Sequence, residues 1–142
     1  MKIYITENID KAIDGYYMIP IIYGKIDVST IPNNIGEKIV AIDALDSIPY
    51  NLLDAFLSLV LLKMRMGCEL ILGGTELSIV AQDIINNKID SQKFNEVIFN
   101  KRGVYSVKNI IDKLCANNLK ILDVNIKGYH YELTAVRPAN KN

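Results

Sequence analysis

Short runs of β-branched and aromatic residues, bounded by Gly, Pro or Asn, recur along the chain. Runs of this kind predict β-strands. The predicted strands cover residues 2–6, 15–22, 25–29, 37–43, 68–72, 120–127 and 129–136. The 37–43 and 68–72 runs are almost continuously apolar, which is typical of strands covered on both faces. The last two runs meet at Gly128, and this predicts an antiparallel hairpin.

Apolar residues between these runs recur at helical spacing. The predicted helices cover residues 50–66, 76–86 and 106–118. Ser47 offers an N-cap to the first helix and Pro49 lies just inside its start, while Gly67 predicts its end. Ser106 caps the last helix. We expect residues 87–105 to be irregular and Gly73-Gly74 to turn the chain.

Strands that alternate with helices predict an α/β domain whose sheet is mostly parallel, with a reversed strand in the C-terminal hairpin. The first three strands have almost no helix between them, although parallel neighbours need a crossover connection. Either a helix has been lost or these strands pair differently. We expect a single domain over residues 1–137, followed by a flexible tail over 138–142.

Composition narrows the class of protein. The 142 residues are 50% hydrophobic, and 16 Lys+Arg balance 16 Asp+Glu. A chain without net charge lacks the positive field on which non-specific nucleic-acid binding depends, so we expect no nucleic-acid partner. The high apolar content also excludes a disordered chain.

The cysteines and the N-terminus indicate a cytoplasmic protein. Cys68 and Cys115 show no metal-ligand spacing, and the chain has one His, so we expect no metal site. Either the two cysteines are free thiols in a reducing compartment, which we favour, or they form a single disulfide with each other. The chain starts without a signal-peptide pattern and has no apolar run long enough to span a membrane. Lys outnumbers Arg thirteen to three, which suits an AT-rich cellular or viral genome.

The order of elements and several short motifs resemble the class I S-adenosylmethionine-dependent methyltransferases. The nearest pattern is that of small predicted methyltransferases in which a short loop replaces the first helix. The matching pieces are a strand with its Asp and turn, a strand with its "LDSIP" continuation, a "RMGCELIL" stretch and a late helix, at residues 25–32, 37–49, 65–72 and 103–118. The resemblance implies a Rossmann-like, three-layer domain.

The resemblance also implies S-adenosylmethionine as cofactor if the protein is active, and it identifies the residues at the cofactor site. Thr6 and Glu7 stand where the family has a glycine-rich loop, which lets backbone approach the ligand. Pro20 lies where an acidic residue would bind the ribose. Asp27 stands where the family contacts adenine, although it would equally cap the turn at Ser29.

Asp43 and Asp46 follow the fourth strand, at the sheet edge where open α/β folds bind ligands. A carboxylate there could act as a general base, so both are candidate catalytic residues. Asp46 departs from the Glu of the family, and Ser47 departs from its His and is explained by helix capping. We expect His130 to pack on its strand and Lys101 to lie in a solvated loop.

The 50–66 helix is apolar over more than one face. Phe56, Leu57, Val60, Leu61 and Met64 spread around it. Two interpretations are open: the 87–105 segment covers the helix, or the helix is an interface with another subunit.

These observations predict a degenerate methyltransferase-like domain without catalysis. It would act as a binding, assembly or structural subunit in a homo-oligomer or with a protein partner. A compact form of an enzyme fold would suit a phage, in the virion or the host cytoplasm. The alternative is an active S-adenosylmethionine-dependent methyltransferase with an atypical cofactor loop, and a third possibility is a small-molecule sensor.

Overall fold

A six-stranded sheet forms the centre of the molecule, in the order β2-β1-β3-β4-β6-β5. The computed structural model describes residues 1–139, so the last three residues of the predicted tail lie outside the described residues. The strands are β1 (Lys2–Thr6), β2 (Tyr17–Pro20), β3 (Gly36–Ala41), β4 (Met64–Thr75), β5 (Lys120–Lys127) and β6 (His130–Val136). The α-helices are α1 (Leu53–Lys63), α2 (Leu77–Ile85), α3 (Ser91–Ile98) and α4 (Val107–Ala116), and two short 3-10 turns cover Ala44–Ser47 and Tyr50–Leu52.

The first four strands are parallel, whereas β6 runs antiparallel to both β4 and β5. The predicted α/β class, the mostly parallel sheet and the C-terminal hairpin are therefore confirmed. Apolar side chains align across the strands, and one row joins Ile3, Ile39, Leu70 and Ala135. All four are buried, and this row is part of the core.

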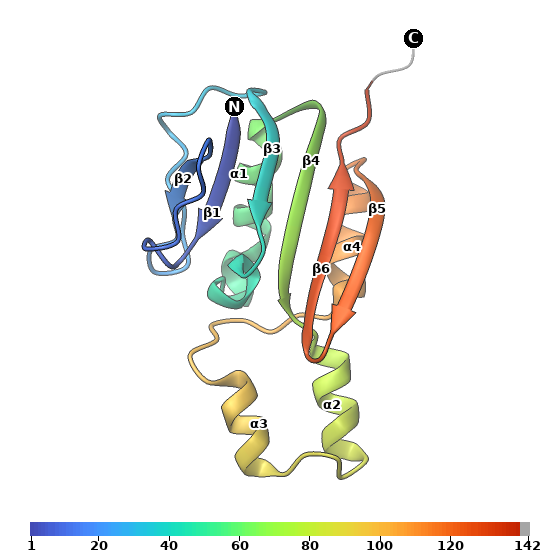
Figure 1. The fold of residues 1–142 in the computed structure, drawn as a ribbon. Coiled ribbons are helices and arrows are strands. Elements are labelled where there is room, and N and C mark those ends of the chain that lie inside the picture. Colours follow the sequence, from blue (N-terminus) through green and yellow to red (C-terminus); the bar gives the residue numbers. More distant parts are fainter. Residues whose placement is uncertain (140–142) are drawn as a thin grey trace.

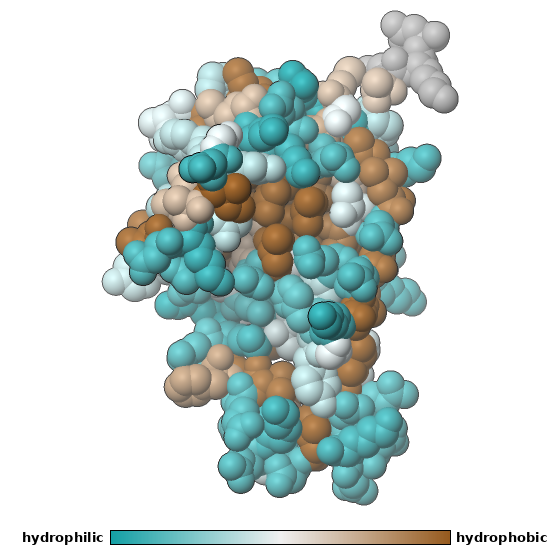
Figure 2. Space-filling view, in the orientation of Figure 1, coloured by the Kyte–Doolittle hydropathy of each residue, from teal (hydrophilic) through white to brown (hydrophobic). Residues whose placement is uncertain are grey.

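Helices α1 and α4 lie on the same face of the sheet (Figure 1). An ion pair between Asp54 and Lys113, with 2.6 Å between the carboxylate and the ammonium, links the two helices. The opposite face has no helix over it among residues 1–139, and hydrophobic residues are visible in its middle (Figure 2). The resemblance implies a layer of helices on each face of the sheet, and on this face of the described chain only loops take the place of that layer.

Strands β1 and β2 are direct parallel neighbours, joined by residues 7–16 without a helix. This settles the question that the sequence left open, because a loop has taken the place of the usual crossover helix. The loop folds back along the uncovered face, where the Lys2 ammonium lies 5.8 Å from the centre of the Tyr16 ring.

The predicted strand at residues 25–29 is wrong. The chain makes only an isolated bridge between Ile22 and Lys25, and the segment then crosses the outer side of α1. Ile26 and Val28 alternate as they would in a strand, but they and Ile31 are buried in the same core cluster as α1. An extended segment that packs against a helix can thus show the same alternation of buried and exposed residues as a β-strand.

The interface proposed for this helix is also wrong. Phe56, Leu57, Val60 and Met64 are buried, and Leu61 is partly buried against the same core. The helix is apolar on two sides because the sheet covers one side and residues 21–31 cover another. The covering segment is therefore not 87–105, which was the other interpretation of the pattern.

The first helix also ends earlier than predicted. Lys63, buried in the last turn of α1, donates hydrogen bonds to the Ile31 carbonyl at 2.6 Å and the Asn33 side chain at 2.8 Å. Strand β4 begins at the next residue, and Gly67 lies within it at a φ of +80°. Gly73 and Gly74 also lie in β4, paired with Glu132 and Tyr131, and do not turn the chain.

The predicted helices at 76–86 and 106–118 are confirmed as α2 and α4, with Glu76 and Ser106 as their N-caps. Helix α3 lies within the 87–105 segment that we expected to be irregular. Its apolar residues Phe94, Val97 and Ile98 have helical spacing and Asp90 caps its start, but the helix has only eight residues and none of them is fully buried. Helices α2 and α3 lie beyond the C-terminal ends of the parallel strands (Figure 1). In the described part of the chain, no helix combines the length and apolar character needed to cross a membrane.

Candidate functional site

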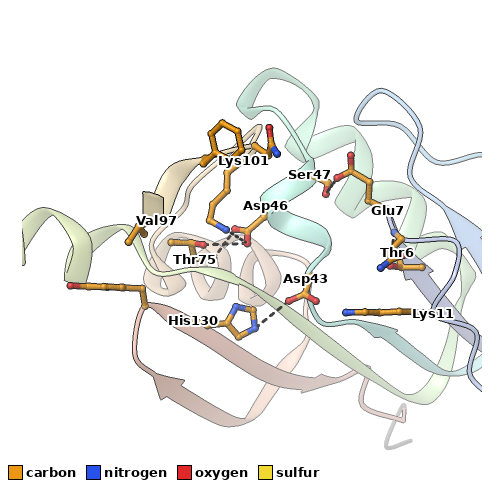
Figure 3. Close-up of a pocket in the computed structure, with 14 residues that line it drawn as sticks. Thr6, Glu7, Lys11, Asp43, Asp46, Ser47, Thr75, Val97, Lys101 and His130 are labelled. Atoms are coloured by element: carbon orange, nitrogen blue, oxygen red, sulfur yellow. Dashed lines mark hydrogen bonds and ion pairs between the residues drawn. The ribbon is translucent and has the colours of Figure 1, made fainter. Parts of the chain in front are cut away.

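A cleft of about 550 Å³ lies where the parallel strands end (Figure 3). The ends of β1 and β4, the turn after β3 and the start of β6 form its floor, and the segment after α3 forms its outer wall. Its lining residues are Thr6, Glu7, Asn8, Lys11, Asp43, Asp46, Ser47, Thr75, Val97, Phe99, Asn100, Lys101, Tyr129 and His130. This is the edge at which open α/β sheets bind their ligands.

Asp46 ties three segments together on one side of the cleft. Its carboxylate accepts hydrogen bonds from the Thr75 backbone N–H at 2.7 Å and the Thr75 hydroxyl at 3.2 Å. The Lys101 ammonium lies 3.3 Å from the second carboxylate oxygen. The Asp46 carbonyl also accepts from the Arg102 N–H at 2.7 Å. Because these groups engage both carboxylate oxygens, Asp46 is better suited to hold the loops than to remove a proton from a substrate.

Asp43 is the more accessible of the two candidate acids. Its side chain is 68% exposed, and one carboxylate oxygen lies 3.7 Å from His130 Nε2. Lys11 points toward this carboxylate from the other side of the cleft (Figure 3). A carboxylate, an imidazole and an ammonium therefore converge on the cleft, and they could bind a small polar ligand or move a proton within it.

Residues 6–8, which follow β1, are held by their own side chains. The Thr6 hydroxyl accepts a hydrogen bond from the Asn8 backbone N–H at 3.0 Å, which makes a tight turn. The Glu7 carboxylate accepts from the Ser47 hydroxyl, so it joins the end of β1 to the short helical turn after β3. Both residues that stand in place of the family's glycine-rich loop thus reach the cleft and make internal contacts there. Ser47 makes no side-chain cap, so the capping role expected for it is wrong.

Asp27 is not brought to the cleft. It is exposed on the segment that covers α1, and its carboxylate accepts hydrogen bonds from the Ser29 backbone at 3.0 Å and the Ser29 hydroxyl at 2.6 Å. These hydrogen bonds hold the pKa of Asp27 below its usual value. The structure therefore shows the turn-capping role, which was the alternative interpretation of this residue.

Polar side chains behind the cleft fix helices α2 and α4 to the sheet. Glu76 is buried, and its carboxylate accepts from the Ser78 N–H at 3.1 Å, the Ser78 hydroxyl at 2.7 Å and the Val107 N–H at 2.7 Å. The Tyr129 hydroxyl donates to Asp83 at 2.6 Å. Helices α2 and α4 are thereby fixed relative to β4 and the hairpin.

Sequence analysis missed Lys11, Lys101 and His130 as cleft residues. One signal could have identified His130: the first residue of a reversed strand lies at the same edge as the last residues of its parallel neighbours. Its sheet partner is Thr75, at the end of β4. Lys11 and Lys101 come from irregular segments, and their positions depend on how these loops fold. Within residues 1–139, no group of His, Cys, Asp and Glu is arranged to hold a metal ion.

The fold is that of the class I S-adenosylmethionine-dependent methyltransferases. The chain superposes on a SAM-dependent methyltransferase from Archaeoglobus fulgidus with a TM-score of 0.60 and 10% identity, covering 95% of this chain and 85% of that one. A SAM-dependent methyltransferase from Aquifex aeolicus gives a TM-score of 0.53 and 14% identity, with coverage of 87% and 56%. A structure of a complex between a methyltransferase and its activator protein from Haloferax volcanii gives 0.59 and 6%, with coverage of 94% and 66%.

These similarities concern the fold, since each identity is below 25%. No protein-family model and no curated protein sequence matches the chain. The chain spans little more than half of the Aquifex aeolicus structure, at 56% of its length.

Proposed function

We propose that this chain is a methyltransferase-like domain that does not transfer methyl groups and acts as a binding or assembly subunit. The observation that carries the proposal is the hydrogen bond between Ser47 and the Glu7 carboxylate. In the family, glycines after the first strand let the cofactor approach the backbone. Here a carboxylate side chain spans that region and is anchored on the turn after β3, so these residues do not fit S-adenosylmethionine bound in the family's manner.

The residues beyond the loop support the same conclusion. Strand β2 ends at Pro20, which offers no carboxylate to a ribose and, as a proline, no backbone N–H. Asp27 lies outside the cleft, on the segment that covers α1, and its carboxylate is engaged with Ser29. Each contact that the resemblance implied for the cofactor is therefore replaced by an internal contact of the protein or is directed elsewhere.

We infer a role in assembly because a fold of this kind that does not bind its cofactor can still bind a protein partner. The complex from Haloferax volcanii contains a methyltransferase and an activator protein, which is a precedent for protein partners of this fold. We place the protein in the cytoplasm of a cell or of a phage-infected host, on the grounds of its free thiols and its preference for Lys over Arg.

The second candidate is an active methyltransferase with an unusual cofactor loop. The contact between Asp43 and His130 favours it, because an acid and a base meet there at the edge where the chemistry of this fold occurs. In that case Asp43→Asn would abolish turnover while the protein still bound S-adenosylmethionine.

Thermal unfolding tests the proposal. A ligand at one hundred times its Kd stabilises a protein by about 2.7 kcal/mol, which would raise the Tm of a domain of this size by roughly 8 °C. We expect no shift with S-adenosylmethionine or S-adenosylhomocysteine at millimolar concentration. A shift that increases with the concentration of either compound would favour the active enzyme.

A further inference from the structure

Strand β5 is an open edge of the sheet. In the described chain it pairs with β6 alone, and it is eight residues long. The opposite edge, β2, has four residues and ends in a proline. An edge strand presents unpaired backbone groups, and long edges with apolar side chains are pairing sites.

The apolar residues of β5 are solvent-exposed. Leu122, Val124 and Ile126 are 50%, 37% and 43% exposed, although each is a large hydrophobic side chain. Hydrophobic residues are visible along this edge of the molecule (Figure 2), and β5 is the outermost strand there (Figure 1). We propose that β5 pairs with β5 of a second copy of this chain, in antiparallel orientation about a two-fold axis at Asn125.

The geometry of the hairpin determines which groups are free to pair. The two-residue turn Gly128-Tyr129 makes Lys127 and His130 the first pair of the β5–β6 ladder. In an antiparallel hairpin closed by such a turn, the backbone N–H and C=O groups of every second residue, starting with Lys127, form hydrogen bonds with β6. The backbone groups of Val124 and Ile126 consequently point to the open edge, where an added strand would find them.

The side chains select one register. Val124 and Ile126 pair with Leu133 and Tyr131, which places them on the helix-covered face, whereas Asp123 and Lys127 lie on the other face. With Asn125 opposite its own copy, Val124 faces Ile126 of the second chain and Asp123 faces Lys127 of the second chain. Apolar side chains then pair on one face of the sheet, and two pairs of opposite charge form on the other face. Cross-strand pairs of both kinds stabilise a sheet.

Neighbouring registers lose this match. A shift that centres the axis on Asp123 sets two carboxylates opposite each other, and a shift to Ile126 sets Lys127 opposite Asn125. The register shift of the ladder between Ile121 and Asp123 limits the pairing segment to residues 123–127. Charge complementarity therefore favours a second copy of the chain, in one register, as the occupant of this edge.

This inference rests on the proposed assembly role and names the partner. The first test exchanges charges. Lys127→Glu would put two carboxylates opposite each other at both symmetry-related sites, and we expect the dimer Kd to rise roughly tenfold. The double variant Asp123→Lys with Lys127→Glu restores opposite charges and is expected to return the Kd to near the wild-type value. Sedimentation velocity over a concentration series measures both.

A cysteine pair tests the register directly. Asn125 would lie about 4.5 Å, Cα to Cα, from its own copy, which is within disulfide range. In a Cys115→Ser background, Asn125→Cys is expected to form a disulfide-linked dimer in air. Glu132→Cys is the matched control, because it lies beside Asn125 on β6 and the two copies would be about 14 Å apart.

A wild-type protein that stays monomeric, a double variant that is no better than the single one, or equal cross-linking of the two cysteine variants would overturn the proposal. These outcomes are separate from the proposed function. A monomer that ignores S-adenosylmethionine contradicts the dimer alone, and a dimer that binds S-adenosylmethionine contradicts the non-catalytic role alone.

Discussion

Two buried tyrosines beneath the cleft differ in how their hydroxyl groups are satisfied. The Tyr105 hydroxyl donates to the Ile48 carbonyl, whereas the Tyr131 hydroxyl has no hydrogen-bond partner among the described residues. Tyr131 is fully buried between the sheet and the helices. A buried polar group without a partner costs free energy, while one with a partner contributes to stability.

The two hydroxyl groups should therefore respond oppositely to removal. We expect Tyr105→Phe to lower the free energy of unfolding by about 1 kcal/mol and Tyr131→Phe to leave it unchanged or raise it by up to about 1 kcal/mol. Urea unfolding of the two variants beside the wild type measures the difference. The packing argument fails if Tyr131→Phe is the more destabilising of the pair.

Alkaline pH should destabilise the fold. Burial raises the pKa of the Cys68 thiol to about 11 and that of Tyr105 to about 12, and it raises the pKa of Tyr131 further. As the pH rises above about 9, the unfolded chain loses these protons while the folded chain keeps them, so the unfolded state is favoured. We expect the free energy of unfolding to fall from pH 9 upward, and to fall less steeply in Tyr131→Phe. A flat profile between pH 9 and 11 would contradict this.

At the scale of residues, the strand-end rule found part of the site. Asp43 and Asp46 follow a parallel strand and reach the cleft as that rule predicts, and Thr6 and Glu7, identified from the resemblance, reach it at the end of β1. Asp27 was misplaced because its strand does not form. What each carboxylate does depended on partners distant in sequence, such as Lys101 for Asp46, and a single sequence does not show these contacts.

At the scale of elements, strand β4 requires glycine at two positions, Gly73 and Gly67, for two different physical reasons. A Cβ on Gly73 would collide with the backbone carbonyl oxygens of Ile42 and Tyr131, which cannot rotate away. Gly67, in the same strand, has open space around it but a φ of +80°. The first glycine is needed for packing and the second for backbone conformation.

These two requirements predict different costs. We expect Gly73→Ala to lower the free energy of unfolding by more than about 3 kcal/mol or to prevent folding. Gly67→Ala should cost only about 1 kcal/mol, the penalty for a left-handed alanine. Urea unfolding and the yield of soluble protein measure both, and equal costs for the two variants would contradict the close-approach argument.

The pattern identified most elements but not all their boundaries. Strands β1, β3, β5 and β6 and helices α2 and α4 were predicted within a few residues, because alternation or helical spacing is clear in each. The α1–β4 junction was missed because Lys63 ends the helix through contacts with Ile31 and Asn33, more than twenty residues earlier in the chain. Helix α3 was missed although Phe94, Val97 and Ile98 have helical spacing, because its eight residues are fewer than the span over which such spacing identifies a helix.

At the scale of the whole molecule, the described part of the chain keeps a six-stranded, mostly parallel sheet and has helices over only one of its two faces. One face carries α1 and α4, while the other has a loop at β1 and β2 and hydrophobic residues in its middle (Figures 1 and 2). The mostly parallel sheet and its reversed C-terminal strand could be predicted, because both follow from the alternation of strands and helices and from the resemblance. The sequence showed the loss of covering helices only in part, because it revealed that the first strands lack helical crossover connections but not that the whole second face is left without a helix from residues 1–139.

The central claim is that the Glu7–Ser47 contact has replaced cofactor binding. Calorimetric titration with S-adenosylmethionine and S-adenosylhomocysteine, at protein concentrations that detect millimolar affinity, tests it most directly. We predict no binding heat for either compound with the wild-type protein. Saturable binding of either compound by the wild type would contradict the claim, and methyl transfer that Asp43→Asn abolishes without loss of binding would identify the cleft as a working methyltransferase site.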